Sequence, residues 1–295
     1  MSNKNSISII LVNYNTATLT CNCIKSIYDK VNDIDYEIIV VDNASQDDSC
    51  ELIAQTFPDV RLIKSNSNLG FGRANNLGAK SATGDYLFFL NTDTLLLNNP
   101  LPYFLQTLRN NPQVGVVGAF LKNKVGEYCR SGGKTYTINK YLKIALRAFL
   151  HKESTKEIDF TGEQAQVGYV LGADMFMSKS LFNELKGFDE NIFMYFEDVE
   201  LCDRIMQKGK QCLLIKGPEI IHLEGASTTS QFSRLHNTAS MIYCFTKKYN
   251  PLQVRIFQIC YFILKLPLLI VGKNKSEELD YLMSIFRYNR YLSQL

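Results

Sequence analysis

Several common sequence features are absent from this chain of 295 residues. Its eight cysteines include no CxxC pair, so the pattern does not indicate a zinc–thiolate site and favours reduced core thiols in a cytosolic protein. The N-terminal segment MSNKNSISII lacks the long apolar stretch of a secretory signal, and we expect a polar lead into a strand there. No GxGxxG motif follows the first apolar run and no GxxxxGK(S/T) motif occurs, which excludes the two common phosphate cradles.

Strong net charge is absent as well. The value of +3 is too small to indicate a nucleic-acid partner. Residues 234–295 nevertheless contain nine Lys or Arg and three acidic residues, a local balance of +6. This basic tail indicates a partner surface with negative charge, for which anionic lipid headgroups are a candidate.

Five apolar runs of strand length lie within the first 120 residues. They are rich in β-branched or aromatic residues and do not alternate with polar ones, as expected for strands covered on both faces. The runs are residues 6–15, 35–43, 60–66, 85–93 and 113–120. Helical patterns lie between the first four, so this βαβα order predicts an α/β protein with a parallel, doubly wound sheet.

Polar side chains follow four of these runs, at the point where each strand is expected to end. They are Asn13 and Asn15, Asp42 and Asn43, Asn66 and Asn68, and Asn91 and Asp93. Each alone is also typical of a turn or a helix cap. Because ligands of open parallel sheets bind beyond the C-terminal strand ends, the four sets together predict a ligand site. Without a phosphate cradle, a nucleotide there would be held by carboxylates, amides or a metal ion.

The second half of the chain shows a basic helical pattern and an acidic helix start. Residues 134–152 contain five Lys or Arg and no acidic residue, which is typical of a basic surface helix or of one that binds membrane or acceptor. Further along we expect a strand ending at Met177, a helix over residues 179–185, and a helix beginning near Glu197 that two short strands follow.

Glu197 and Asp198 begin this last helix, where the helix dipole favours ionised carboxylates. An ionised carboxylate on a rigid element beside a cleft can accept a proton from a hydroxyl group. Acidic residues are also common at helix starts without any catalytic role. The preceding residues 188–196 are rich in aromatic and aliphatic side chains, which favours a wall or a lid beside the two acids.

Taken in order, these motifs resemble glycosyltransferase family 2, inverting enzymes of the GT-A fold, and within it the bacterial rhamnosyltransferase-like branch. The resemblance covers residues 6–230 and rests on VNYN, VVDNASQDDS, NLGFGRANNLGA, LNTDT, GAD and GFDENIFMYFEDVELC. It implies a Rossmann-like, mostly parallel central sheet flanked by helices. The catalytic domain is expected over residues 1–230, with a nucleotide-binding half at 1–120 and an acceptor or catalytic half at 121–230.

The resemblance also implies roles for residues at the strand ends. Asp42 matches the acid that recognises the nucleobase, and Asn13 lies beside it. Asp93 matches the last acid of the DxD motif, which holds Mg²⁺ or Mn²⁺ against the donor diphosphate. The first position of that motif is Asn91, so one carboxylate is present and the diphosphate is expected to supply much of the metal coordination.

Three residues of the second half match functional positions of the family. Asp198 matches the catalytic base of the Glu–Asp pair, in which Glu197 is its neighbour. Adjacent helix residues point about 100° apart, so we expect one of the two to face the sugar. His222 matches a histidine that approaches the metal or the diphosphate in some relatives.

These roles imply an inverting, metal-dependent transferase that moves a sugar, with rhamnose one candidate, from a dTDP- or UDP-sugar. The implied acceptor is a glycan or lipid-linked glycan of bacterial surface polysaccharide synthesis. Two alternatives stay open. One is a nucleotide-sugar-binding protein that has lost catalysis, which Asn91 leaves open, and the other is a nucleotidyltransferase, which also needs metal-binding carboxylates at strand ends.

Residues 231–295 are expected to form a helical, basic extension. Within it, residues 251–275 are strongly apolar but interrupted by Arg255, Gln258, Lys265 and Pro267. A membrane span needs ~20 mostly apolar residues and is therefore not favoured. A helix in the membrane interface is favoured, with a helix packed on the catalytic domain as the alternative. We accordingly expect a cytoplasmic protein at the inner face of the cell membrane.

Overall fold

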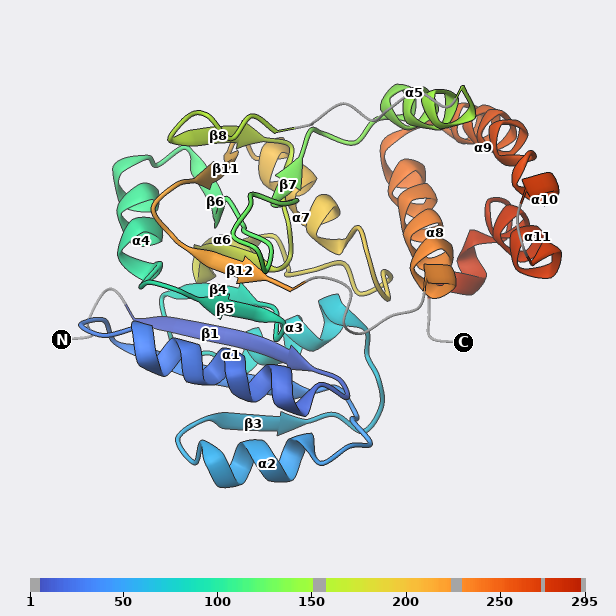
Figure 1. The fold of residues 1–295 in the computed structure, drawn as a ribbon. Coiled ribbons are helices and arrows are strands. Elements are labelled where there is room, and N and C mark those ends of the chain that lie inside the picture. Colours follow the sequence, from blue (N-terminus) through green and yellow to red (C-terminus); the bar gives the residue numbers. More distant parts are fainter. Residues whose placement is uncertain (1–5, 151–157, 224–229, 272–273, 293–295) are drawn as a thin grey trace.

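The computed structural model describes residues 6–150, 158–223, 230–271 and 274–292. Its centre is a sheet of eight strands in these described parts, in the order β3-β2-β1-β4-β10-β6-β11-β8 (Figure 1). The strands are β1 (Ile7–Asn13), β2 (Tyr36–Asp42), β3 (Arg61–Lys64), β4 (Tyr86–Leu90), β6 (Val114–Ala119), β8 (Gln164–Val167), β10 (Asp174–Ser178) and β11 (Gln211–Ile215). Neighbouring strands run parallel except where β10 and β8 are involved. The predicted mostly parallel α/β sheet is confirmed.

Helices cover both faces of this sheet. One face packs against α1 (Ala17–Lys30), α2 (Ser49–Thr56) and α4 (Leu101–Asn110), and the other against α3 (Phe71–Ser81), α6 (Lys179–Glu184) and α7 (Glu197–Gln207). Successive strand residues enter opposite layers: Ile9 and Ile10 of β1 are both fully buried, in different core clusters. Burial on both faces is the reason why the strand sequences show no polar alternation.

Two small antiparallel sheets accompany the main one. β5 (Thr94–Leu96) pairs with β12 (Ile220–His222), and β7 (Gly132–Gly133) pairs with β9 (Tyr169–Val170). The first pairing makes His222 the register partner of Thr94. A residue from far along the chain is therefore placed at the end of the LNTDT motif.

The helices that follow β12 form a group to one side of the sheet, together with α5 (Ile138–Phe149), the helix predicted within residues 134–152 (Figure 1). They are α8 (Ser230–Lys248), α9 (Pro251–Lys265), α10 (Leu268–Val271), α11 (Lys275–Ser284) and the 3₁₀ helix η1 (Tyr288–Tyr291). Asn250 and Gln253 form a capping box at the start of α9, which fixes where that helix begins. Phe245 of α8, Phe257 of α9 and Leu201 of α7 belong to one hydrophobic cluster. The C-terminal helices therefore share a core with the helix that carries the acidic pair.

The apolar stretch Pro251–Ile270 is long and apolar enough to cross a membrane by length and composition, with a mean hydropathy of 1.5. The sequence pattern did not favour a membrane span, because polar residues interrupt the stretch, but its length and composition alone meet the requirement for one. The packed arrangement that the sequence left as an alternative applies to one face of α9, where Phe257 is fully buried. The opposite face is exposed, as Ile256 and Ile263 show at 52% and 55%.

Candidate active site

The first part of the candidate site is a polar pair at the C-terminal ends of β1 and β2. The parallel register places Asn13 beside Asp42, and the Asn13 Nδ2 atom donates to Asp42 Oδ1 at 2.8 Å. The Thr20 hydroxyl donates to Asn13 Oδ1 at 2.6 Å, and the Ser45 backbone N–H donates to Asp42 Oδ2 at 3.0 Å. Both side chains of the pair are buried. The Asp42 carboxylate is thus fixed in one orientation, as a group that recognises one ligand geometry must be.

The second part is the turn after β4, which carries Asp93. The Asn91 carbonyl accepts hydrogen bonds from the Thr94 backbone N–H at 3.2 Å and from its hydroxyl at 2.7 Å, so the chain bends sharply between them. The pairing of β5 with β12 brings His222 to this bend, where its Nε2 atom lies 3.3 Å from Asp93 Oδ1. Two residues that the sequence singled out separately therefore face each other.

Threonine hydroxyls connect these two parts. The Thr16 hydroxyl donates to Asn13 Oδ1 at 3.0 Å and lies 3.4 Å from the hydroxyl of Thr92, the residue before Asp93. The ends of β1, β2 and β4 therefore form one continuous polar edge. The sequence predicted this edge but not the threonines that join it.

The pair of Asp93 and His222 fits a divalent cation. A carboxylate oxygen and an imidazole nitrogen that face each other form a donor set that Mn²⁺ accepts, and Mg²⁺ accepts the carboxylate. Within the described ranges, no group of three or more His, Cys, Asp or Glu is placed to hold a metal. Two protein ligands would leave coordination positions for diphosphate oxygens and water.

The third part is the acidic pair in the first turn of α7. Asp198 Oδ2 accepts the Gly172 N–H at 2.9 Å, and Oδ1 accepts the Val199 N–H at 2.7 Å. Glu197 is as buried as Asp198, and its Oε2 atom has no hydrogen-bond partner among the described residues. A Cβ added at Gly172 would lie 3.6 Å from Asp198 Cβ, and one added at Gly72 would lie 3.6 Å from Glu197 Cβ. The side chains of Asp198 and Glu197 therefore leave the helix beside different segments, at Gly172 and Gly72 respectively.

Burial raises the pKa of both carboxyl groups. For Glu197 the pKa is well above its ordinary value because of burial first and the Asp198 charge second. For Asp198 burial also dominates, although the Gly172 N–H and the Arg130 charge lower the pKa. The sequence indicated that the helix dipole favours the ionised form of both acids, but burial acts in the opposite direction and raises both pKa values. Arg130 was not singled out from the sequence, where it lies outside any periodic pattern.

A short loop joins the acidic pair to the turn after β4. Gly172 donates to Asp198, and the next residue, Ala173, accepts a hydrogen bond from the Asn91 N–H at 3.0 Å. One dipeptide of the GAD motif therefore separates Asp198 from Asn91. The contacts described here bring the site residues to the same end of the sheet: Asn13, Asp42, Asn91, Asp93, Glu197, Asp198 and His222.

The Gly-rich segment around α3 supports the loop that leads to the acidic pair. The Asn76 side chain donates to the Phe188 carbonyl and accepts the Phe188 N–H, each at 2.9 Å. Gly70 has a φ of +81°, and a Cβ there would lie only 2.0 Å from the Phe193 carbonyl oxygen. Glycine is required at that position because the loop backbone passes so close. α3 therefore holds residues 188–196, which lead into α7.

Most of this loop is core, not a lid. Exposure is 6% or less for Phe188, Ile192, Phe193 and Phe196. Of the two interpretations, a wall or a lid, the lid is therefore wrong for these four residues. Tyr195 and Phe196 have φ values of 65° and 69°, a left-handed conformation that is costly for side chains of this size. The Phe196 ring packs against Tyr136 and Tyr141, which helps to hold this conformation directly before Glu197.

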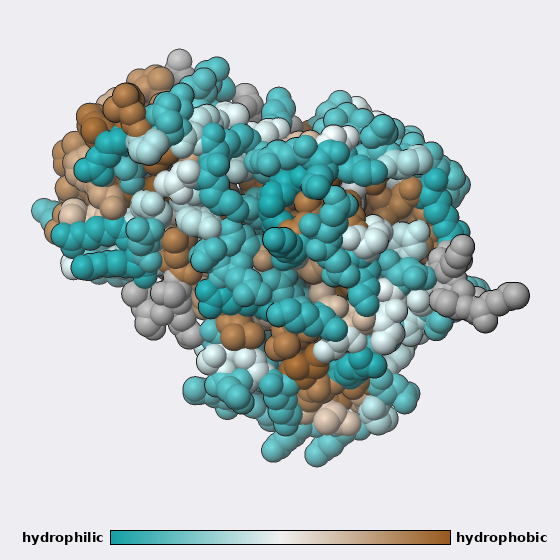
Figure 2. Space-filling model, turned by 180° about the vertical axis from the view of Figure 1, so that it is seen from behind, coloured by the Kyte–Doolittle hydropathy of each residue, from teal (hydrophilic) through white to brown (hydrophobic). Residues whose placement is uncertain are grey.

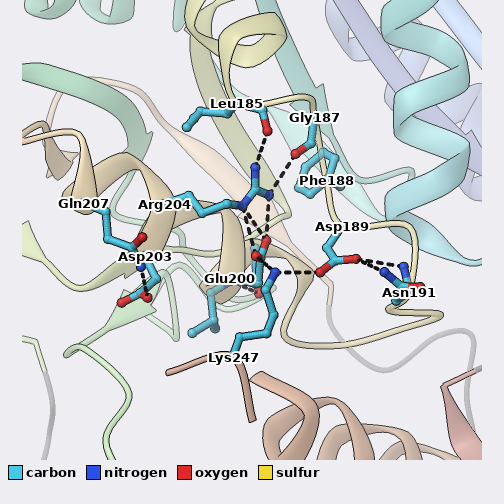
Figure 3. Close-up of polar contacts among 12 residues, drawn as sticks. Leu185, Gly187, Phe188, Asp189, Asn191, Glu200, Asp203, Arg204, Gln207 and Lys247 are labelled. Carbon is cyan, nitrogen blue, oxygen red and sulfur yellow. Dashed lines mark hydrogen bonds and ion pairs between the residues drawn. The ribbon is translucent and has the colours of Figure 1, made fainter. Parts of the chain in front are cut away.

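The later turns of α7 are held by a charged network (Figure 3). Arg204 donates to Glu200 at 2.6 Å and to the carbonyl oxygens of Leu185 and Gly187 at 2.6 and 2.8 Å. Lys247 of α8 contacts Glu200 and, at 2.7 Å, Asp189 in the loop (Figure 3). This network fastens α7 and the loop before it to α8. Glu200 and Arg204 are four positions apart, but Lys247 and Asp189 are distant from them in the chain, so the sequence did not predict the network.

Solved structures with this architecture are glycosyltransferases of the GT-A fold. GalNAc-T7 with UDP, GalNAc and Mn²⁺ is 14% identical with a TM-score of 0.64, and the alignment covers 97% of this chain and 57% of that chain. The mannosyltransferase PcManGT from Pyrobaculum calidifontis, in complex with GDP-Man and Mn²⁺, is 16% identical with a TM-score of 0.60, over 99% and 89% of the two chains. These likenesses establish the GT-A fold.

The chain belongs to glycosyltransferase family 2, whose family model, "Glycosyl transferase family 2", matches residues 8–182. The N-acetylglucosaminyl-diphospho-decaprenol L-rhamnosyltransferase of Mycobacterium tuberculosis is 24% identical over 214 residues, 65% of this chain and 67% of that protein. Rhamnosyltransferase WbbL of Escherichia coli K12 is 24% identical over 222 residues, 72% and 82% of the two chains. The predicted family and its rhamnosyltransferase-like branch are confirmed.

Proposed function

We propose that this chain is an inverting glycosyltransferase that moves a sugar from a dTDP- or UDP-sugar to a glycan or lipid-linked glycan in bacterial surface polysaccharide synthesis. Rhamnose is the first candidate sugar. The observation that carries the proposal is a buried carboxyl group with a raised pKa, Asp198, one dipeptide from Asn91 at the polar edge of the sheet. The names of the two rhamnosyltransferases, one acting on a diphospho-decaprenol, support the sugar and the acceptor class.

In this proposal the nucleotide-sugar donor binds at the polar edge formed by the ends of β1, β2 and β4. The Asp42 carboxylate, oriented by Asn13 and Ser45, would accept hydrogen bonds from the N–H groups of a nucleobase. Asp93 and His222 would hold Mg²⁺ or Mn²⁺. When bound, this cation stabilises the negative charge that develops on the departing nucleoside diphosphate.

Asp198 is the proposed general base. It accepts the proton of the acceptor hydroxyl while that oxygen forms a bond to the anomeric carbon. The bond from this carbon to the diphosphate breaks, and its electron pair leaves with the nucleoside diphosphate. A single displacement inverts the anomeric configuration. Asp198 is better suited than Glu197 because backbone N–H groups and Arg130 stabilise its charged form, whereas the pKa of Glu197 lies further above its ordinary value.

Donor turnover with a panel of dTDP-, UDP- and GDP-sugars tests the proposal, with Mg²⁺, with Mn²⁺ and with EDTA. We expect turnover of a dTDP- or UDP-sugar that EDTA abolishes. Asp93→Ala should lose both turnover and metal-dependent donor affinity, whereas Asp59→Ala, at an exposed acid outside the site, should keep them. Donor binding without any turnover would favour the nucleotide-sugar-binding alternative, and full turnover in EDTA would contradict the metal role.

A further inference from the structure

Helix α9 is apolar on two opposite faces. On its inner face, Phe257 packs against Phe245 of α8 with ring centroids 4.8 Å apart, and Gln258 donates to the Ile285 carbonyl at 2.6 Å. The outer face carries aliphatic side chains that are between 37% and 82% exposed, which we call the outer stripe: Leu252, Ile256, Ile259, Ile263, Leu266 and Ile270. Their spacing of three or four residues aligns them along one side of α9 and α10.

The outer stripe is a concentrated apolar surface. Seen from behind, the molecule shows hydrophobic side chains gathered over this helical group, at the upper left of Figure 2. Exposed apolar residues scattered singly are normal on a protein surface, but a contiguous line along a helix indicates a binding surface. A helix that is apolar both inside and outside needs a second apolar environment on its outer side.

The helices that carry the stripe, and the neighbouring α5, bear charge of one sign, whereas α11 beside α10 carries Glu277, Glu278 and Asp280. The described parts of α5, α9 and α10 contain no acidic residue, and their basic residues are Lys140, Lys143, Arg147, Arg255 and Lys265, of which Lys265 lies over the inner-face Tyr261 ring. α5 lies beside α9 and exposes Ile144 and Phe149 at 44% and 46%. Apolar residues flanked by cations match the acyl boundary and the headgroups of an anionic bilayer. In a symmetric pairing of two copies, by contrast, like charges would face each other.

The inner contacts of α9 decide how it can meet a bilayer. Crossing the membrane would remove Phe257 from the core that it shares with α8, and would break the bond from Gln258 to Ile285. Lying along the surface keeps those contacts and immerses the outer stripe alone. We propose that the outer stripe, with the basic residues of α5 and α9, docks this protein on an anionic lipid bilayer with α9 parallel to the membrane plane.

This docking surface lies close to the proposed catalytic machinery. Tyr141 of α5 packs on Phe196 with ring centroids 5.8 Å apart, and Phe196 directly precedes Glu197. Resting on the proposed function, this arrangement presents the site to a lipid-linked acceptor held in the same bilayer.

Vesicle co-sedimentation of the full chain tests the docking surface without needing any catalytic activity. We expect binding to phosphatidylcholine vesicles that contain phosphatidylglycerol, and weaker binding to phosphatidylcholine alone. The double variant Ile256→Glu/Ile263→Glu removes two exposed apolar side chains and should lower binding at least ~10-fold. Val125→Glu, at a residue 69% exposed in a turn outside the described helices, is the matched control and should bind as wild type does.

A second variant tests the cations. Lys143→Ala/Arg147→Ala should lower binding to phosphatidylglycerol vesicles roughly 10-fold or more and leave binding to neutral vesicles unchanged. Donor turnover in solution should be unaffected in both double variants, and transfer to an acceptor embedded in vesicles should fall. If the wild-type protein turned over no donor, the proposed function would be contradicted, but the vesicle-binding result would still test the docking surface.

Three outcomes would overturn the docking proposal. The first is a wild-type protein that ignores anionic vesicles, and the second is an Ile256→Glu/Ile263→Glu variant that binds them equally well. The third is a wild-type dimer in light scattering that this variant converts to a monomer without any vesicle binding, which would assign the stripe to an interface between two copies. Resistance of bound protein to alkaline carbonate would overturn the parallel orientation in favour of a span.

Discussion

The acidic pair that begins α7 and the acids that follow it in the helix are buried in opposite ways. Exposure is between 2% and 7% for Glu197, Asp198, Glu200 and Asp203. Further along the helix from this pair, Glu200 is paired with Arg204 and Lys247, and Asp203 with Lys248 at 2.6 Å. In the first turn, the hydrogen bonds to Asp198 come from backbone N–H groups, and the Oε2 atom of Glu197 has no partner among the described residues.

This difference separates structural acids from a functional candidate. A buried carboxylate with a cation beside it is compensated and anchors one element to another. A buried carboxyl group without one destabilises the folded state, and such groups gather at functional sites because a raised pKa serves proton transfer. Four acids within seven positions of one helix therefore differ in how their burial is compensated.

The largest effect is expected from the first turn. Asp198→Asn keeps the shape of the side chain and removes the proton acceptor, so the transfer rate should fall by about 10²–10⁴. Donor affinity should be nearly unchanged, because it rests on Asp42 and Asp93. Calorimetry with the donor and a parallel transfer assay measure the two quantities.

Glu197→Gln is the matched control for this substitution. It alters the adjacent acid in the same turn and should retain most of the transfer rate. If Glu197→Gln is inactive while Asp198→Asn transfers sugar at near the wild-type rate, the base is Glu197 and the assignment is wrong.

The sequence predicted where the strands and their polar ends lie better than it predicted the long-range contacts between those ends. Continuous apolar runs specify strands buried on both faces, so β1, β2, β4 and the polar residues that follow them could be placed from local pattern alone. His222 could be singled out by resemblance, but its contact with Asp93 depends on the pairing of β5 with β12, which local pattern does not encode.

The second acidic region could not be interpreted from the sequence for the same reason. Glu200 lies 47 positions from Lys247, and no local signal pairs them. The burial of loop 188–196 could not be predicted locally, because it depends on Asn76 and Gly70 of a distant motif. Periodicity reports which face of an element is apolar, and long-range packing decides what covers that face.

A smaller effect is expected from the paired acids. Lys247→Met removes the cation shared by Glu200 and Asp189, although Arg204 still neutralises Glu200. Because the Lys247 head group is partly exposed, we expect a loss of about 1–2 kcal/mol in the free energy of unfolding. The melting temperature should fall by a few degrees, and the transfer rate of the folded protein should stay near that of wild type.

Lys208→Met provides the control for Lys247→Met. Lys208 pairs with Glu184 at 2.7 Å, but both side chains are more than half exposed, so no measurable change in melting temperature is expected. Equal melting temperatures of the two variants would show that the network around Glu200 does not stabilise α7. A large loss of transfer rate in Lys247→Met would show that the network also positions the first turn.

The smallest expected effect is a change in how stability depends on pH. The pKa of Glu197 is raised in the folded protein, whereas an unfolded glutamic acid titrates at about 4.3. Above that ordinary value and up to the raised one, the folded state holds a proton that the unfolded state has lost, so this group makes stability fall as pH rises. Glu197→Gln removes the titration. Its melting temperature relative to wild type should therefore increase from pH 5 to pH 8.

Because the charges of Glu197 and Asp198 interact, Glu197→Gln also alters the titration of Asp198, whereas two other shifted groups do not affect the comparison. Lys247 and the Asn191 N–H lower the pKa of Asp189 to about 2, so the stability that Asp189 provides is lost only as the solution becomes more acidic than this window. Burial lowers the pKa of His236, which makes stability rise with pH near neutrality, but His236 is present in both proteins and cancels in the difference. Thermal unfolding of both proteins at pH 5, 6, 7 and 8 measures the trend. A constant difference across these values would mean that Glu197 titrates normally, and the two ends of α7 would then no longer differ in the way proposed.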